Sequence, residues 1–327
     1  MSTLCKATVQ IETDRFRELR LFLEAITDAK NLLEPEQLEV RLNALDELDA
    51  LIGGLDLDLL RSCPDSWPLA SVEALQFQFE TANERLYESM HYEIALRRNS
   101  RALEYWLSAL TKNEKADEFH PGLGFDLLDE IVCGVLQLRE PGEVDVLPAA
   151  EMTDYQPTPV RHILDLIRVC KLSIDDVFVD LGSGLGHVSV MVNILAGIRT
   201  LGVEIQPHYA RSAQQTAQRL NLSGVRFVAQ DAREADLSSG TVFYLFTPFT
   251  GSILTKVLHR LQQESLTRPI KVCVLGPSTR ILQDQTWLRA DQQLDTERVT
   301  LFESFDTSRQ RRTKHKATSS TGSSSPA

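Results

Sequence analysis

Apolar residues recur at helical spacing through the first third of the chain. Between Pro35 and the pair Gly53-Gly54, the apolar stripe consists of Leu38, Leu42, Leu45, Leu48 and Ile52. This spacing places the stripe on one side of a helix, and paired glycines are typical of a helix end. Similar spacing predicts further helices over residues 16–29 and 72–110. We therefore predict an all-α domain over residues 1–115.

Residues 116–306 follow a second pattern, in which short apolar runs alternate with amphipathic segments. The runs that suit buried strands are 177–180, 200–203, 225–229, 242–246 and 270–275. The amphipathic segments that suit connecting helices are 186–196, 207–220 and 251–264. This alternation predicts an α/β fold with a doubly wound, mostly parallel, Rossmann-like sheet. A last apolar run at 299–305 suits an antiparallel closing strand, whose partner the pattern does not identify.

Composition agrees with two folded domains and narrows the expected partners. The chain has 327 residues, 43% of them hydrophobic, and its 34 Lys and Arg against 46 Asp and Glu give a net charge of −12. This balance repels nucleic acid and anionic membranes and suits basic or neutral partners. We therefore expect neither nucleic acid nor a membrane as a partner. Residues 307–327 are rich in serine and basic residues and are predicted to be disordered.

Cysteine and histidine spacing argues against disulfide and metal chemistry. The cysteines are Cys5, Cys63, Cys133, Cys170 and Cys273. Their odd number and the absence of a Cys-x-x-Cys pair disfavour a disulfide framework or a zinc site and favour a reducing compartment. The histidines form no ligand pattern, so no metal is indicated. Without an apolar signal core or a run of roughly 20 apolar residues, a cytoplasmic location is the expectation.

The first predicted strand of the sheet runs directly into a glycine-rich turn. Residues 180–186 read Asp-Leu-Gly-Ser-Gly-Leu-Gly, and Glu204 closes the next apolar run. Glycines let the backbone approach a ligand closely, and an acid at that place can accept hydrogen bonds from two ribose hydroxyls. The pair therefore points to a bound adenosine cofactor. His187 stands where a dinucleotide fingerprint has its third glycine, which disfavours NAD.

This turn, followed by Glu204, resembles the first two cofactor motifs of class I S-adenosylmethionine-dependent methyltransferases. The resemblance implies that S-adenosyl-L-methionine is the cofactor, that Glu204 holds its ribose, and that Asp231, after the third strand, lies beside its adenine. The turn residues implied to carry the methionine and sugar parts are Gly182, Ser183, Gly184 and Gly186. Asp180 is expected to order the turn through backbone N–H groups and to reach the amino end of the cofactor.

A short segment before the first strand combines an aromatic residue with a Pro-Thr-Pro sequence. Residues 152–159 read Met-Thr-Asp-Tyr-Gln-Pro-Thr-Pro. Thr158 suits a helix N-cap, with Pro159 as the first helical residue. The segment also resembles the cofactor-pocket entry of protein lysine methyltransferases outside the SET-domain class, in which case Tyr155 and Thr158 contact the cofactor. Both interpretations stay open. Residues 177–204 further resemble the non-SET histone lysine methyltransferases related to the disruptor of telomeric silencing.

The fourth predicted strand ends at the sheet edge where the transferable methyl is expected, and Thr247, Pro248 and Phe249 follow it. Amino-directed members of the fold often have Asn, Asp or Ser, then two prolines and an aromatic residue, at this place. Thr247 offers a hydroxyl instead of an amide or a carboxylate, which leaves a nitrogen acceptor in doubt. A proline that merely ends a buried strand is the structural alternative. The candidate catalytic residues are thus Thr247, Pro248, Phe249 and Tyr155.

Methyl transfer from a sulfonium needs alignment and desolvation more than a triad, because the leaving group needs no protonation. His187 begins the helix beside the cofactor, but a helix N-terminus disfavours its protonated form, so we interpret it as structural. Asp154 and Tyr155 are alternative proton acceptors.

Functions from different classes remain open at this point. The leading hypothesis is an S-adenosylmethionine-dependent methyltransferase whose acceptor is a protein lysine. A small-molecule N- or O-methyltransferase is the alternative, and a non-catalytic cofactor-binding scaffold with a helical partner-binding domain is the second alternative. A nicotinamide or flavin oxidoreductase is disfavoured, because the sequence lacks the third glycine of the fingerprint. The identity of the methyl acceptor and the oligomeric state do not follow from the sequence.

Overall fold

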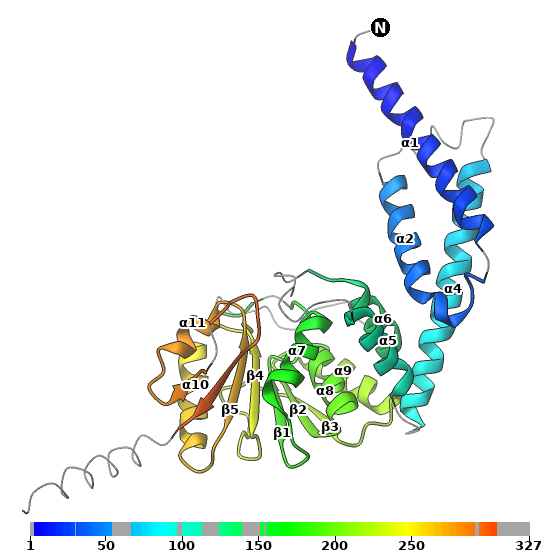
Figure 1. Ribbon diagram of the computed structural model, residues 1–327. Coiled ribbons are helices and arrows are strands. Elements are labelled where there is room, and N and C mark those ends of the chain that lie inside the picture. The colour runs from blue at the N-terminus through cyan, green and yellow to red at the C-terminus, as the bar shows by residue number, and fades with distance from the viewer. Residues whose placement is uncertain are drawn as a thin grey trace, which may run out of the picture. The chain divides into compact units, whose positions relative to one another are not determined.

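The computed structural model describes residues 3–29, 31–53, 67–96, 100–112, 124–138, 151–153, 155–291 and 294–305 (Figure 1). Its contacts divide the chain into a first unit, Met1–His91, and a second unit, Tyr92–Ala327. This division precedes the predicted boundary at residue 115, because residues 92–112 group with the sheet. The predicted tail at 307–327 and the candidate proton acceptor Asp154 lie outside the described residues.

The first unit is helical, as its apolar stripe predicts. Its elements are α1 (Thr3–Asp28), the 3-10 helix η1 (Pro35–Gln37), α2 (Leu38–Ile52) and α4 (Trp67–Ala95), which continues past the end of the unit. Leu38, Leu42 and Leu48 of the predicted stripe are fully buried. The N–H of Gly53 donates to the carbonyl of Asp49 (2.8 Å) and closes α2. The predicted start and end of this helix are therefore confirmed.

The single helix predicted over residues 72–110 is wrong, because the structure has two helices there. The first, α4, ends at Ala95, and α5 spans Arg101–Thr111. The sequence from 97 to 100 reads Arg-Arg-Asn-Ser, which interrupts the apolar spacing. Ser100 begins α5, and its hydroxyl donates to the carboxylate of Glu104.

The second unit contains a seven-stranded sheet, which confirms the predicted α/β class. Its strands are β1 (Val177–Leu181), β2 (Arg199–Glu204), β3 (Val225–Ala229), β4 (Val242–Phe246), β5 (Lys271–Leu275), β6 (Leu288–Arg289) and β7 (Thr300–Ser304). The order is β3-β2-β1-β4-β5-β7-β6, with β1 to β5 parallel and β7 antiparallel to both neighbours. The partner that the pattern left unidentified is therefore β6, which is too short to show an apolar alternation of its own.

One face of the sheet carries a row of residues that the strand register sets side by side. The row consists of Phe227, Gly202, Asp180, Tyr244 and Cys273. Helices α7 (Val160–Cys170), α8 (His187–Ala196) and α9 (Pro207–Arg219) belong to this face. Cys170 at the end of α7 contacts Cys273 (Sγ–Sγ 2.7 Å), and Gln214 of α9 accepts from the N–H of Phe227 (3.0 Å).

The opposite face is covered by α10 (Gly251–Ser265), and the short α11 (Ser278–Gln283) follows β5. The apolar core on this side joins α10 to β1, β4 and β5 through Val179, Leu181, Phe243, Leu245, Val272, Val274, Ile253, Val257 and Leu261. Helices on both faces make the sheet doubly wound, as predicted. Crossovers that run in opposite directions from β1 and β4 leave a crevice at the carboxyl ends of these strands, which is where such folds bind ligands.

Within the described ranges, no helix has both the length and the apolar character needed to cross a membrane.

Gly202 of β2 lies beneath the glycine turn in a space that fits no side chain. A Cβ atom there would lie 2.3 Å from Cδ1 of Phe227 and 2.7 Å from Oγ of Ser183. We therefore expect Gly202→Ala to lower the free energy of unfolding by about 1–3 kcal/mol, because the ring and the turn must both shift. Urea denaturation of the full chain measures the loss.

Combining Gly202→Ala with Phe227→Leu tests whether the overlap with the ring of Phe227 causes this loss. Gly202→Ala should be less destabilising in the Phe227→Leu background than in the wild type, since the ring edge that it meets has been removed. An equal loss in both backgrounds would show that the ring is not the constraint.

Candidate functional site

A cavity of about 350 Å³ lies at the carboxyl ends of the central strands. The sequence-predicted residues on its wall are Tyr155, Thr158, Asp180, Gly182, Ser183, Glu204, Asp231, Thr247, Pro248 and Phe249. Asp180 and Glu204 belong to β1 and β2, the segments after β1, β3 and β4 supply most of the others, and the segment before α7 supplies Tyr155 and Thr158. Segments up to about 90 residues apart in sequence thus meet in one place because parallel strands end at the same edge of the sheet.

Two of the predicted turn glycines, Gly184 and Gly186, are absent from the cavity wall. Both have left-handed φ angles, of 51° and 85°. A Cβ on Gly184 would lie 2.2 Å from Cε2 of Tyr155, and one on Gly186 would lie 2.4 Å from Cζ of Phe227. These two glycines therefore make room for protein side chains. Gly182 does line the cavity, and a Cβ there would lie 2.3 Å from Cβ of Pro248.

Glu204 holds the glycine turn in place from the end of β2. Its Oε2 accepts from the N–H of Gly184 (2.9 Å), and its Oε1 accepts from the N–H of Gln206 (2.8 Å). The side chain is buried, and burial raises the pKa of this carboxyl. Each carboxylate oxygen has a second lone pair, so Glu204 can hold the turn and still accept from a ligand in the cavity.

Asp180 is a second buried carboxylate on the same wall. Its carboxylate accepts from the hydroxyl of Ser189, at 3.4 Å. Burial raises the pKa of Asp180 to about 7, and the negative charge of Glu204 adds to the effect. Among the residues that the structure describes, no Lys or Arg forms an ion pair with either carboxylate. The cavity therefore offers two desolvated acids that have no cationic partner among the described residues.

Asp231 differs from these acids because it already has a cationic partner. Both of its oxygens accept from the guanidinium of Arg233, at 2.6–3.0 Å, and Oδ1 also accepts from the Arg233 N–H (2.8 Å). These hydrogen bonds hold the pKa of Asp231 below its ordinary value. Asp231 thus reaches the cavity wall as part of an ion pair.

Tyr155 lies against the glycine turn within a group of polar rings. Its hydroxyl is 3.2 Å from Nδ1 of His187, whose Nε2 is 3.7 Å from Sγ of Cys133. Burial lowers the pKa of His187 to about 4, so the imidazole is neutral at pH 7. The ring of Tyr155 also meets that of Tyr209 (centroids 5.2 Å apart). Tyr209 was missed by the sequence analysis, although its place in the first turn of the helix after Glu204 is a usable signal.

Thr158 does not cap α7, so that prediction is wrong. The N-cap is Pro159, and the N–H of Val160 donates instead to Oδ1 of Asp129 (2.8 Å) in α6 (Leu127–Leu136). A buried carboxylate 31 residues earlier in the chain thus does the capping. The hydroxyl of Thr158 turns to β4 and lies 3.1 Å from that of Tyr244. Thr158 therefore packs against β4 and lines the cavity.

The segment after β4 is bound to the segment before α7. The hydroxyl of Thr153 donates to the carbonyl of Thr247 (2.8 Å), and the N–H of Thr153 donates to the carbonyl of Pro248 (3.2 Å). Met152 forms an antiparallel bridge with Phe249. Phe249 is buried in the core below α10.

Thr247 itself has a left-handed φ of 43°, which is an unusual backbone conformation for a β-branched residue. Its hydroxyl donates to the carbonyl of Leu275 (3.1 Å). The oxygen of that hydroxyl keeps lone pairs that can accept, and Thr247 itself lies on the cavity wall.

Comparison with known proteins identifies the type of domain. Residues 152–242 match the family model described as histone methylation protein DOT1. A protein-lysine N-methyltransferase from Saccharolobus islandicus (strain REY15A) is 27% identical over 137 residues, which cover 41% of this chain and 78% of the relative. The family-model match spans the glycine turn, Glu204 and Asp231.

Two solved structures with weaker likeness come from enzymes with different acceptors. An RNA methyltransferase from Salinibacter ruber, in complex with S-adenosyl-L-homocysteine, is 25% identical with a TM-score of 0.36, covering 46% of this chain and 92% of its own. Magnesium protoporphyrin IX methyltransferase from Synechocystis is 17% identical with a TM-score of 0.32, covering 43% and 74%. Scores this low support no argument about the acceptor. From the family match, the curated relative and the observed fold, the second unit is a class I S-adenosylmethionine-dependent methyltransferase domain that resembles the DOT1 histone methylation proteins.

Proposed function

We propose that the cavity binds S-adenosyl-L-methionine and that the protein transfers its methyl group to the side-chain nitrogen of a protein lysine. The observation that carries the first part is the pair of buried carboxylates, Asp180 and Glu204, on a wall without a Lys or Arg partner in the described chain. Buried charges need a partner of opposite sign or hydrogen-bond donors. A ligand with an ammonium, a sulfonium and a ribose diol supplies both.

Other features of the cavity agree with this ligand. The hydroxyl of Ser183 is buried on the wall, and within the described chain it has no hydrogen-bond partner, which is unfavourable unless a ligand supplies one. The residues proposed to hold the cofactor are Asp180 at the amino group, Glu204 at the ribose, Asp231 at the adenine side, and Tyr155, Thr158, Gly182 and Ser183 around the methionine part. Gly184 and Gly186 would act by shaping the turn, because they do not reach the wall.

The bound cofactor supplies an electrophilic methyl group, and the chain supplies alignment and a dry site. Thr153 and Thr247 close the wall by their hydrogen bond, and Pro248 packs on the glycine turn. Thr247 presents a hydroxyl oxygen that accepts, because its proton is used at Leu275. Tyr155 presents a hydroxyl 3.2 Å from Nδ1 of the neutral His187, and its oxygen can accept a hydrogen bond from the N–H of an incoming amine that has already lost its proton to water.

Two arguments favour a lysine as the methyl acceptor. The matching family is described by histone methylation, and the curated relative is a protein-lysine N-methyltransferase. The wall beside Thr247 is largely apolar, with Phe246, Pro248, Phe249 and Pro277, and suits the methylene stem of a lysine. An accepting oxygen at Thr247 also suits an N–H donor. A threonine at this position is therefore compatible with nitrogen as the methyl acceptor.

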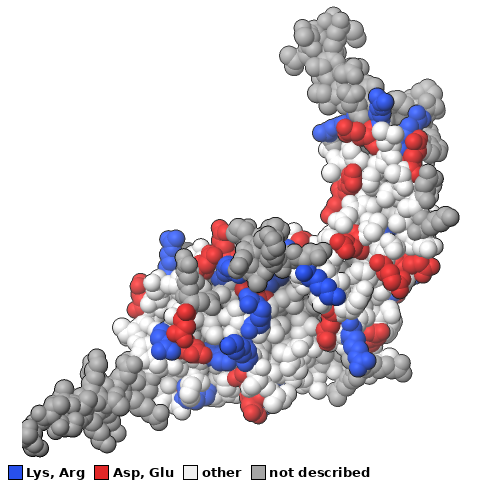
Figure 2. All heavy atoms as spheres, in the orientation of Figure 1, with Lys and Arg blue, Asp and Glu red and all other residues white. Residues whose placement is uncertain are grey.

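Surface charge supports this choice of acceptor only weakly. On the face drawn in Figure 2, Lys and Arg are interspersed with Asp and Glu, so the net charge of −12 does not gather there into one acidic surface. The exclusion of nucleic acid as a partner therefore stays a prediction, as does the cytoplasmic location.

The acceptor is tested with the full chain, S-adenosylmethionine labelled in its methyl group, core histones, lysine peptides and a panel of small amines and phenols. We expect label on protein lysine. Thr247→Val should lower that transfer by about tenfold or more, because it removes the accepting oxygen worth roughly one hydrogen bond to a charged group. Affinity for S-adenosylhomocysteine should stay within about threefold.

Two further variants separate the hydroxyl from the backbone strain at this position. Thr247→Ser keeps the oxygen and should keep most of the transfer. Thr247→Asn keeps an accepting oxygen and suits the left-handed backbone, so it should retain transfer and raise stability. Label on small molecules alone, or full lysine transfer by Thr247→Val, would contradict the proposed acceptor site.

The raised pKa of Asp180 predicts how binding depends on pH. In the free protein this carboxyl is protonated below about pH 7, whereas an ammonium beside it favours the ionised form. Affinity for S-adenosylhomocysteine should therefore weaken as pH falls from 7 to 5, by up to about tenfold per pH unit for one linked proton. Calorimetry from pH 5.5 to 8.5 measures the slope.

Asp180→Asn is the control for this slope, because it removes the titrating group. His187 stays neutral throughout this range, and Asp231 stays ionised beside Arg233, so Glu204 is the other acid on the described cavity wall that can contribute. A slope that is unchanged in Asp180→Asn would assign the proton to Glu204 and remove Asp180 from the amino end.

Gly184→Ala is expected to abolish detectable cofactor binding in a chain that still folds. The new Cβ would overlap the ring of Tyr155 and displace it from the cavity wall. Gly197→Ala is the matched control, because Gly197 also has a left-handed φ, of 69°, but has open space around it. Both variants should lose about 1–2 kcal/mol of stability from the backbone conformation. Equal affinities in the two variants would refute the role of the Tyr155 contact.

A further inference from the structure

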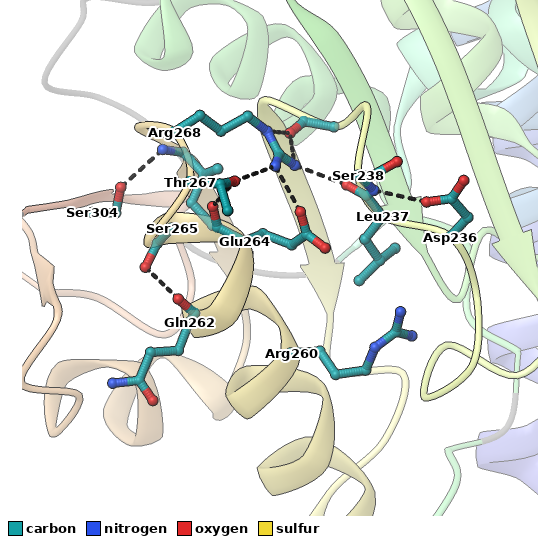
Figure 3. Close-up of polar contacts among 12 residues, drawn as sticks. Asp236, Leu237, Ser238, Arg260, Gln262, Glu264, Ser265, Thr267, Arg268 and Ser304 are labelled. Atoms are coloured by element: carbon teal, nitrogen blue, oxygen red, sulfur yellow. Dashed lines mark hydrogen bonds and ion pairs between the residues drawn. The ribbon is translucent and has the colours of Figure 1, made fainter.

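Two arginines, one within α10 and one just after its end, donate hydrogen bonds to the connection between β3 and β4. Arg260, within α10, donates from Nη1 to the carbonyl of Ala232 (3.1 Å) and from Nη2 to that of Ala235 (2.5 Å). Arg268 donates to the carbonyls of Leu237 (2.9 Å) and Gly240 (2.7 and 2.9 Å). Figure 3 shows the Arg268 contacts and the side chain of Arg260, which precedes Arg268 in the chain and lies on the body of α10.

These contacts satisfy carbonyls that no helix or strand satisfies. A guanidinium has five N–H donors in a planar fork, so one side chain can bind two carbonyls of an irregular segment. Apolar packing adds to this, because Ala232, Ala235 and Leu237 are buried in the same core as α10. The connection is thereby fixed to the helix on the face of the sheet opposite α8 and α9.

The two arginines act at different distances from the cavity. Asp231 and Ala232 line it, whereas Leu237 and Gly240 do not. Asp231 also opens a single turn, since its carbonyl accepts from the N–H groups of Glu234 (2.9 Å) and Ala235 (3.0 Å). Arg260 binds the carbonyls at the beginning and the end of this turn. Arg268 binds only the part that leads into β4.

We propose that Arg260 is a positioning residue for the adenine side of the cofactor site, acting through the turn at 231–235. The inference rests on the proposed function, because it assigns the ligand that Asp231 and Ala232 meet. Arg260 lies on α10, outside the motifs that carry the cofactor, and reaches the site only through main-chain carbonyls. Arg268 is its structural counterpart and has no part in ligand affinity.

The test compares Arg260→Ala, Arg260→Lys and Arg268→Ala in the full chain. We expect Arg260→Ala to lower the affinity for S-adenosylhomocysteine by about tenfold, because two charge-assisted hydrogen bonds that fix the turn are lost. The affinity for methylthioadenosine, which lacks the amino acid part, should fall by the same factor. Arg260→Lys should recover part of the loss. Arg268→Ala should lower the urea midpoint while affinity stays within about twofold.

If Arg260 contributes only to stability, each alanine variant should lose affinity in proportion to the fall in its urea midpoint. That result would overturn the proposal. So would unchanged affinity in Arg260→Ala. Amide hydrogen exchange without ligand gives an independent reading: Arg260→Ala should speed exchange at 234 and 235, and Arg268→Ala should not. If the wild type binds no S-adenosylhomocysteine, the proposed function fails, while the exchange result still decides whether Arg260 holds the turn.

Discussion

The end of β2 holds the glycine turn after β1, and the site depends on this attachment. The carbonyl of Val203 accepts from the N–H groups of Gly182 (2.8 Å) and Ser183 (3.1 Å), and Glu204 accepts from that of Gly184 (2.9 Å). Three successive N–H groups of an irregular segment are thus bound by two residues of the neighbouring strand. Because the carboxylate of Glu204 is buried, its hydrogen bonds to the turn are stronger than they would be in water. The same side chain then forms part of the cavity wall, so the shape of the turn and the recognition of a ligand are coupled.

The other cavity walls are attached in the same manner, by contacts between segments far apart in sequence. Thr153 binds the carbonyl of Thr247 across 94 residues, and Thr158 meets Tyr244 across 86. On the far side, Arg260 binds the turn that carries Asp231. Each contact joins a loop to a strand end or a helix, and the rigid sheet between them determines where the loops meet. A site built this way is sensitive to changes at positions that never touch a ligand.

The success of sequence reasoning differed between local and long-range features. The strands and the glycine turn were predicted because burial on both faces leaves continuous apolar runs, and because left-handed φ angles at Gly182, Gly184 and Gly186 select glycine. The cap of α7 was mispredicted, because Asp129 does this work from another helix and leaves no local signal. Gly184 and Gly186 were placed on the ligand, whereas their neighbours are aromatic rings from distant segments. The role of Arg260 had no sequence signature, since it binds carbonyls that every residue has.

The electrostatics of the cavity bear on how a methyltransferase cycle would proceed in this domain. The charge of Glu204 raises the pKa of Asp180 in addition to the effect of burial, and burial raises the pKa of Glu204, so the free site is at its least favourable when both are ionised. A cationic ligand relieves this repulsion. Methyl transfer removes the sulfonium charge while the carboxylates remain, so the attraction that favours the cofactor is weaker for the product. The same two acids that are unfavourable in the free protein would thus favour exchange of product for new cofactor, which gives a functional reason to keep them buried with no cationic partner in the described part of the chain.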